Sequence, residues 1–187
     1  MPWAVGALLA TLVLSGCEAE ETPPAGASPS GSSGSTSASP SPTSPSPSAS
    51  PSSAVPPAAR EKSEAGAEAF ARFFLVQAAE AWTVPNPALI EHHSSSECDA
   101  CNELARVAEE LRVNGERYDK PPVTLTKLST IRKSENAYAF DAQLRENAVH
   151  VIGRSGEVVD TYPSRQISRA IAVTWEEGRW LLDGIGE

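Results

Sequence analysis

A tract of Ser, Pro, Ala, Gly and Thr, residues 18–59, limits how much of this 187-residue chain can fold. It contains no aromatic residue, and Val55 is its only large aliphatic side chain. Such a stretch cannot bury enough apolar surface to offset the entropy that it would lose on ordering. We therefore expect residues 17–59 to form a disordered, Ser/Pro-rich tether, and residues 60–187 to form a single domain.

An uncharged apolar run, residues 3–14, lies on the N-terminal side of this tract and is followed by Ser15, Gly16 and Cys17. About a dozen residues are too few to cross a bilayer as a helix, but they fit the apolar part of an export signal. The segment Leu14-Ser15-Gly16-Cys17 resembles the bacterial lipoprotein box. This resemblance implies that residues 1–16 are a lipoprotein signal peptide and that the Cys17 sulfur receives a diacylglyceryl group.

Acylation of Cys17 determines where the protein is expected to work. Each buried methylene contributes about 0.8 kcal/mol, so two or three acyl chains such as palmitate hold a protein firmly on a bilayer. We therefore expect an extracytoplasmic protein that is lipid-anchored to the outer face of the cell membrane, with the bilayer as one partner. The tether would hold the domain away from the membrane, and its Ser, Thr and Pro content also suits O-glycosylation.

The charge distribution excludes one class of partner. Residues 60–187 hold all 15 Lys and Arg together with 21 of the 24 Asp and Glu, and the two signs are interspersed. Because no basic patch is left for a phosphate backbone, we expect no nucleic acid partner.

The first half of the domain is patterned as helix. A helix is predicted over residues 60–83, with one face made by Gly66, Phe70, Phe73, Phe74, Gln77 and Ala81. Asn86-Pro87 predicts the start of a short helix over 87–93. A third helix is predicted from Ser96, as its N-cap, to the stop signal at Asn114-Gly115.

After Pro121-Pro122 the apolar residues recur with a period of two, which indicates strands. The predicted strands cover residues 123–131, 137–147, 149–152, 157–161, 166–175 and 179–185. Arg154-Ser155-Gly156 predicts one hairpin turn. Glu177-Gly178 predicts another, which would place Trp175 opposite Trp180.

Helices followed by an antiparallel meander indicate an α+β fold, with three N-terminal helices packed on a curved, mostly antiparallel sheet. A long helix ending in Trp82, two further helices and a final Trp-Glu-Glu-Gly-Arg-Trp-Leu-Leu hairpin resemble the cone-like fold of nuclear transport factor two and the cystatins. This resemblance implies a sheet that wraps around helices and can leave a pocket. With the tether and Cys98-Asp99-Ala100-Cys101 included, the chain is similar to an actinobacterial lipoprotein family of unknown function, DUF6318, which implies no activity.

Cys98 and Cys101 give the most specific signal for a chemical role, either as a disulfide or as a redox pair. Outside the cytoplasm two thiols this close are expected to form a disulfide, which we interpret as structural. The alternative is a thiol–disulfide oxidoreductase, because a cysteine at a helix N-terminus has a lowered pKa. The pair follows a helix rather than the first strand of a βαβ unit, which argues against that alternative. The two upstream histidines lack zinc-finger spacing, so no metal is predicted.

His92 and His93 are the candidates for a general base, oriented by Asp141 or Glu91. We favour the simpler interpretation, a solvated helix end, where an imidazole suits the helix dipole. The sequence contains no Gly-rich phosphate loop, nucleophile elbow or metal-binding helix motif, so no cofactor is predicted.

These observations favour binding or scaffolding at the cell surface over catalysis. The expected partner of the domain is an unknown envelope protein or a small apolar ligand. Two alternatives stay open: a hydratase or isomerase that uses the pocket of the cone, and an oxidoreductase that uses Cys98 and Cys101. The first alternative requires ionisable side chains that converge in the concavity, and the second requires an exposed Cys98 sulfur.

Overall fold

The computed structural model describes residues 54–186. The long helix predicted from the sequence begins at a serine N-cap. A short 3-10 helix, η1 (Pro57–Arg60), precedes α1 (Glu64–Thr83), and the Ser63 hydroxyl accepts a hydrogen bond from the Gly66 N–H at 3.0 Å. The predicted start at residue 60 is therefore wrong by four residues, since the side chain of Ser63 satisfies one of the free N–H groups of the first turn. All six residues of the predicted stripe are buried.

Two shorter helices follow α1. α2 (Ala88–Glu91) is shorter than the predicted helix, and α3 (Asp99–Asn114) ends at Gly115, which has a left-handed φ of 70°. The N-cap of α3 is Cys98 and not Ser96, because the Cys98 sulfur accepts from the Cys101 N–H at 3.2 Å.

Seven strands form two antiparallel sheets among the described residues. The larger sheet has the order β2-β3-β6-β7 and consists of β2 (Val123–Lys133), β3 (Ala137–Glu146), β6 (Arg165–Glu176) and β7 (Arg179–Gly186). The smaller has the order β1-β4-β5 and consists of β1 (Arg117–Tyr118), β4 (Val149–Ile152) and β5 (Val158–Tyr162). The two-residue strand β1 had no counterpart in the prediction, because so short a pairing leaves no periodic signal.

The predicted turns and the final hairpin register are confirmed. Trp175 lies opposite Trp180, and Glu176 lies opposite Arg179. Glu177 and Gly178 both have positive φ, 49° and 82°, as a two-residue hairpin turn of this hand requires. The loop between β4 and β5 contains Arg154-Ser155-Gly156.

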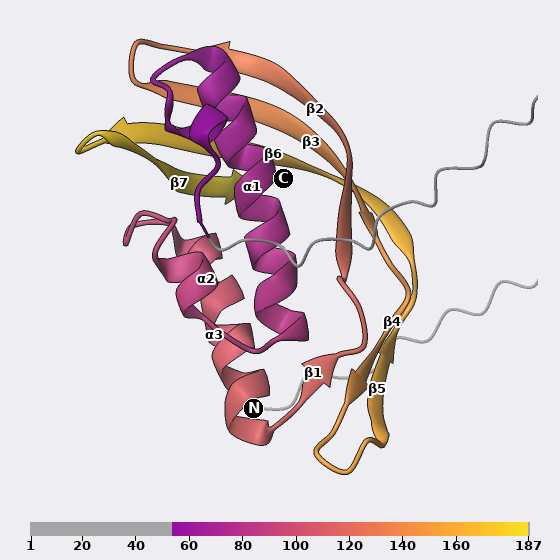
Figure 1. Cartoon of the computed structure of the whole chain (residues 1–187). Helices are drawn as coiled ribbons and strands as arrows, with labels where there is room; N and C mark the ends of the chain where they lie inside the picture. Colours follow the sequence, from indigo (N-terminus) through magenta and orange to yellow (C-terminus); the bar gives the residue numbers. More distant parts are fainter. Residues whose placement is uncertain (1–53, 187) are drawn as a thin grey trace, which may run out of the picture. The chain divides into compact units, whose positions relative to one another are not determined.

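The larger sheet bends around the helices, and α1 crosses its inner face (Figure 1). Register shifts in β2, between Leu125 and Lys127 and between Thr130 and Arg132, mark bulges that bend the strand. At the other edge, the segment after α2 pairs with β7, because the Ser95 N–H donates to the Leu182 carbonyl at 2.8 Å. The α+β class expected from the sequence is confirmed, whereas the strands form two antiparallel sheets instead of the single sheet expected.

The folded part of the chain begins before residue 60. Ala59 is only 1% exposed, and Val55 packs against the same core. The Arg60 Nε also donates to the Val55 carbonyl at 3.0 Å. Residues 54–59, which the sequence assigned to the tether, therefore contact the domain. The rest of the tether, the expected signal peptide and Cys17 lie outside the described residues.

Within residues 54–186, no helix has the length and the apolar composition that crossing a bilayer requires.

Candidate functional site

Two hollows lie between α1 and the sheet and share the side chains of Leu75, Ala79 and Val123. The inner hollow has a volume of about 260 Å³ and is lined from α1, α3, β2, β3, β6 and β7. The outer hollow has a volume of about 640 Å³ and lies between α1 and the start of β2. The walls of the inner hollow are largely aliphatic and aromatic, and include Leu75, Trp82, Leu104, Leu144, Ile167 and Ile171.

The sequence of α1 explains why space is left here. Its first half carries Phe70, Phe73 and Phe74, which fill the core beneath them. Its second half carries Ala78 and Ala79 at the positions that line the hollow. Methyl groups are smaller than phenyl rings, so this half of the helix fills less of the space between itself and the sheet.

Two charged side chains line the inner hollow. Glu146, at the end of β3, forms an ion pair with Arg165 of β6. Arg169 follows Arg165 by four residues in β6 and therefore lies on the same face of the strand. It is half-buried, and its Nη1 donates to the Ser168 carbonyl at 3.0 Å. Within residues 54–186 no carboxylate forms a salt bridge with Arg169. The hollow therefore contains one uncompensated positive charge.

Glu80 is the notable acid of the outer hollow. Burial raises the pKa of its carboxyl group above the ordinary value. Its Oε2 atom is buried and has no hydrogen-bond partner among the described residues. Among residues 54–186 no salt bridge joins the Glu80 carboxylate to another side chain.

Trp82, which lines the inner hollow, belongs to a row of aromatic side chains that continues outside it with Tyr118 and Tyr162. The Trp82 ring lies edge-on to Tyr118, with ring centroids 5.6 Å apart, and Tyr118 contacts Tyr162 at 6.0 Å. Burial is the main cause that raises the pKa of Tyr118 to about 12, with contributions from Tyr162, Asp160 and Glu146. Tyr118 is therefore a neutral phenol at physiological pH.

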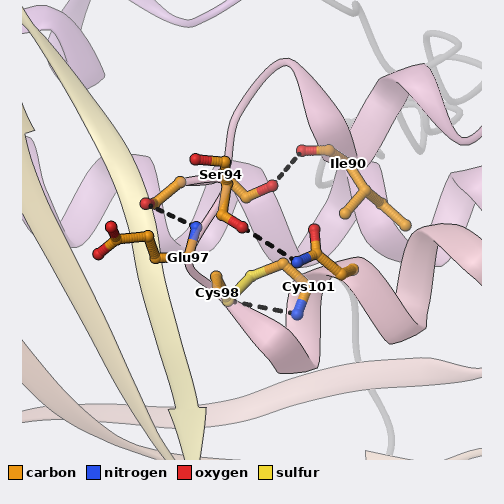
Figure 2. Close-up of a disulfide and its surroundings, with 8 residues drawn as sticks. Ile90, Ser94, Glu97, Cys98 and Cys101 are labelled. Carbon is orange, nitrogen blue, oxygen red and sulfur yellow. Dashed lines mark hydrogen bonds between the residues drawn. A yellow bond between two sulfur atoms is a disulfide. The ribbon is translucent and has the colours of Figure 1, made fainter.

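Cys98 and Cys101 form a disulfide at the start of α3, with Cα atoms 5.2 Å apart (Figure 2). The loop before it is held by its own hydrogen bonds, because the Ser94 hydroxyl donates to the Ile90 carbonyl at 3.0 Å. Both cysteines are buried, with exposed fractions of 1% and 0%. The pair belongs to the hydrophobic core and lies outside both hollows.

The structure does not bring the predicted histidines and Asp141 together. His93 packs edge-on against Phe73, with ring centroids 4.9 Å apart, and burial is the first cause that lowers its pKa, followed by His92 and Arg179. His92 is exposed at the end of α2. Asp141 alternates with the buried Phe140, so it lies on the other face of the sheet, where Ser168 donates to it at 2.5 Å.

His93 is thus a half-buried packing residue, which corrects the expectation of a solvated helix end. Within residues 54–186, no three His, Cys, Asp or Glu side chains gather in a way that could hold a metal ion.

Arg169 and Glu80 were not among the site residues predicted from the sequence. The signal for Arg169 was present, because it shares the inward phase of β6 with Ile167 and Ile171. A charged residue at an apolar position of a strand indicates either an error of phase or a function. Glu80 gave no such signal, since acidic residues are common on exposed helix faces.

The fold and the hollow define an α+β domain with helices on the inner face of a bent antiparallel sheet and an apolar site between the two layers. The chain belongs to DUF6318, a family of unknown function, whose model matches residues 39–185. This match confirms the family resemblance that the sequence suggested, whereas an actinobacterial lipoprotein origin stays a prediction. No curated protein matches the sequence significantly.

Several solved structures are similar to the chain. The intermembrane space region of the chloroplast protein ARC6 has a TM-score of 0.52 and 15% identity, covering 67% of this chain and 96% of that one. A periplasmic fragment of TraM has a TM-score of 0.48 and 15% identity, covering 67% and 96%. A Nostoc punctiforme domain of unknown function with a cystatin-like fold has a TM-score of 0.44 and 16% identity, covering 66% and 76%. At such low identity the likeness concerns the fold alone.

Proposed function

We propose that this protein is a binding module that takes a small apolar ligand into the inner hollow. The observation that supports it most is the lining of that hollow, which collects aliphatic and aromatic side chains from α1, α3 and four strands. Ligand sites are typically concave and mostly apolar, with few polar groups that fix orientation. Glu146 and Arg169 are two such groups.

The same lining favours binding over the hydratase or isomerase alternative. A proton-transfer enzyme needs an acid or base within hydrogen-bond reach of the substrate. Glu146 is engaged by Arg165, and an arginine does not release its proton. His92, His93 and Asp141 are not part of the lining of the inner hollow.

Burial of the cysteines argues against the oxidoreductase alternative. Thiol–disulfide exchange requires an attacking thiolate to reach one of the sulfur atoms. With Cys98 1% exposed and Cys101 fully buried, neither sulfur offers that access in the folded domain. A structural role is the better proposal for this pair.

We also propose that an acylated Cys17 carries the domain on the outer face of the cell membrane. The proposal is supported by the apolar run 3–14 and the Leu14-Ser15-Gly16-Cys17 segment. A buried disulfide fits the same compartment, since such bonds persist mainly outside the cytoplasm. Cys17→Ser should release the protein from the membrane fraction or leave it uncleaved, and unchanged fractionation with normal processing would contradict the anchor.

Filling the hollow tests the binding proposal. Ala79 lines both hollows, so Ala79→Leu places extra methylene groups where a ligand would lie. Octanol, a neutral aliphatic probe, should bind the unaltered chain and bind Ala79→Leu about tenfold or more weakly in titration calorimetry.

Ala65→Leu is the matched control, because Ala65 is exposed near the start of the same helix. It should leave octanol binding unchanged. If octanol does not bind the unaltered chain, or if both variants bind it equally well, the hollow is not the ligand site. An envelope protein would then be the better candidate for the partner.

A further inference from the structure

Arg169 is a charged residue in the largely apolar wall of the inner hollow. It lies on the inward phase of β6 between Ile167 and Ile171, and all three side chains line the inner hollow. Arg169 is half-buried and its hydrogen bond to Ser168 lies at the surface, so its aliphatic stem can follow the apolar wall while solvent and dissolved anions reach its guanidinium group. The position therefore suits an anionic partner.

The described residues do not supply that partner. The nearest acid of the lining, Glu146, forms its ion pair with Arg165, its cross-strand neighbour. The hydrogen bond that Arg169 makes goes to the carbonyl of the preceding residue, Ser168. Most of its N–H donors thus stay available for an anion inside the hollow.

We propose that the inner hollow binds an aliphatic monocarboxylate, with its carboxylate on Arg169 and its alkyl chain against the apolar wall. The inference rests on the proposed function and adds the chemical class of the ligand. The planar guanidinium fork matches a carboxylate with two parallel hydrogen bonds. The chain would lie along side chains such as Leu144, Ile167 and Leu75, which line the same hollow.

A single negative charge fits the site better than two. The hollow offers one uncompensated cation, and the Glu146 carboxylate lies in the same lining. Arg169 can compensate the charge of a monocarboxylate, whereas a doubly charged anion would keep one negative charge without a cation beside the Glu146 carboxylate.

The test compares three ligands with the same chain length, namely octanoate, octanol and octylammonium, by titration calorimetry on the full chain carrying Cys17→Ser. Octanoate should bind at least tenfold more tightly than octanol, and octylammonium should bind more weakly than both. Affinity should rise about fourfold for each methylene from butanoate to octanoate, since each one buries further apolar surface.

Variants of two arginines assign the carboxylate contact. Arg169→Gln should bring octanoate down to the affinity of octanol, a loss of about ten- to hundredfold, while octanol binding stays the same. Arg169→Lys should lose part of the preference, because it keeps the charge without the fork. Arg145→Gln should change nothing, because Arg145 is exposed on the other face of the neighbouring strand.

The outcomes separate the two proposals. Octanol binding without any preference for octanoate, or an unchanged preference in Arg169→Gln, overturns the carboxylate inference and leaves an apolar site. Failure of all three ligands to bind overturns both. Retained octanol binding shows that Arg169→Gln is folded, so a selective loss of octanoate cannot result from unfolding.

Discussion

The two ends of α1 pack differently against the sheet. At the first end, Phe70, Phe74 and the sheet residues Phe140 and Trp180 form a filled core. At the second end, Ala78 and Ala79 face the sheet across the inner hollow. One helix therefore fills the core with its phenyl rings at one end and leaves a hollow beside its methyl groups at the other.

Other elements contribute to the same hydrophobic core. η1 supplies Ala59, and the disulfide supplies Cys98 and Cys101. The Trp180 Nε1 donates to the Glu61 carbonyl at 2.8 Å, which ties β7 to the chain just before α1. At the other end of α1 the Trp82 Nε1 donates to the Leu104 carbonyl at 3.1 Å, which ties α1 to α3.

The largest effect should come from Trp180, the aromatic centre of the filled end. Its ring is 2% exposed and lies against Trp175 and Tyr138, with centroids 5.0 Å and 5.6 Å away. Trp180→Ala should lower the free energy of unfolding by about 3–5 kcal/mol, because it leaves a cavity and an unpaired carbonyl. Denaturant unfolding at constant pH provides the measurement.

Trp82→Ala sharpens the comparison between the two ends. Trp82 lines the hollow and is partly buried, with its Nε1 bonded to the Leu104 carbonyl at 3.1 Å. It should cost clearly less stability than Trp180→Ala, since solvent already reaches the space beside it. Equal losses for the two variants would show that the hollow end is packed as tightly as the filled end.

The segment before α1 should matter next. A chain that starts at Arg60 lacks Val55 and the buried Ala59, and also the hydrogen bond from Arg60 to the Val55 carbonyl. It should lose about 2 kcal/mol of stability, the order expected for removing one buried aliphatic contact. A chain that starts at Ala54 should have the same melting temperature as the full chain. If the two truncated chains melt at the same temperature, residues 54–59 do not stabilise the domain and belong to the tether.

The disulfide should contribute a similar or smaller amount. Replacing Cys98 and Cys101 by Ser should cost about 2 kcal/mol, because the bond closes only a short loop. Octanol binding should persist, since neither cysteine lines a hollow. In the native chain the buried bond should resist reduction by glutathione, and ready exchange with turnover in an insulin reduction assay would establish an oxidoreductase instead.

Most of the filled end could be predicted from local patterns. The spacing of Phe70, Phe73 and Phe74 indicated a buried helix face, and Glu177-Gly178 set the register of the last hairpin. The starts of α1 and α3 were misplaced because several residues near each start could serve as the N-cap, and the structure uses Ser63 and Cys98. These errors are short and leave the topology intact.

The hollow end could not be predicted from local patterns. Its volume depends on how far α1 stands from the sheet, which the β2 bulges and the crossing of the helix determine together. No window of sequence records that distance. The inward phase of Arg169 was the one local signal, and the small residues Ala78 and Ala79 became meaningful only once their neighbours were known.

The smallest expected effect is a pH dependence at the filled end. His93 packs on Phe73, and burial, then the charges of His92 and Arg179, lower its pKa. The folded state therefore disfavours the protonated imidazole. Its neutral form contributes stability in full above the unfolded pKa of about 6.5, and this contribution is lost as the pH falls through the lower folded pKa.

The difference in stability between the native chain and His93→Gln is the quantity to measure from about pH 7 down to pH 5. As the pH falls, the native chain should lose stability relative to the variant. Unfolding of the native chain allows the His93 imidazole to bind a proton, and the variant has no imidazole at this position. His150→Gln, which alters an exposed histidine on β4, should keep the native slope. If His93→Gln also keeps it, the imidazole is protonated as freely in the folded domain as in the unfolded chain. Water then reaches His93 in spite of its contact with Phe73, and the filled end is less tightly packed at this residue than the ring contacts indicate.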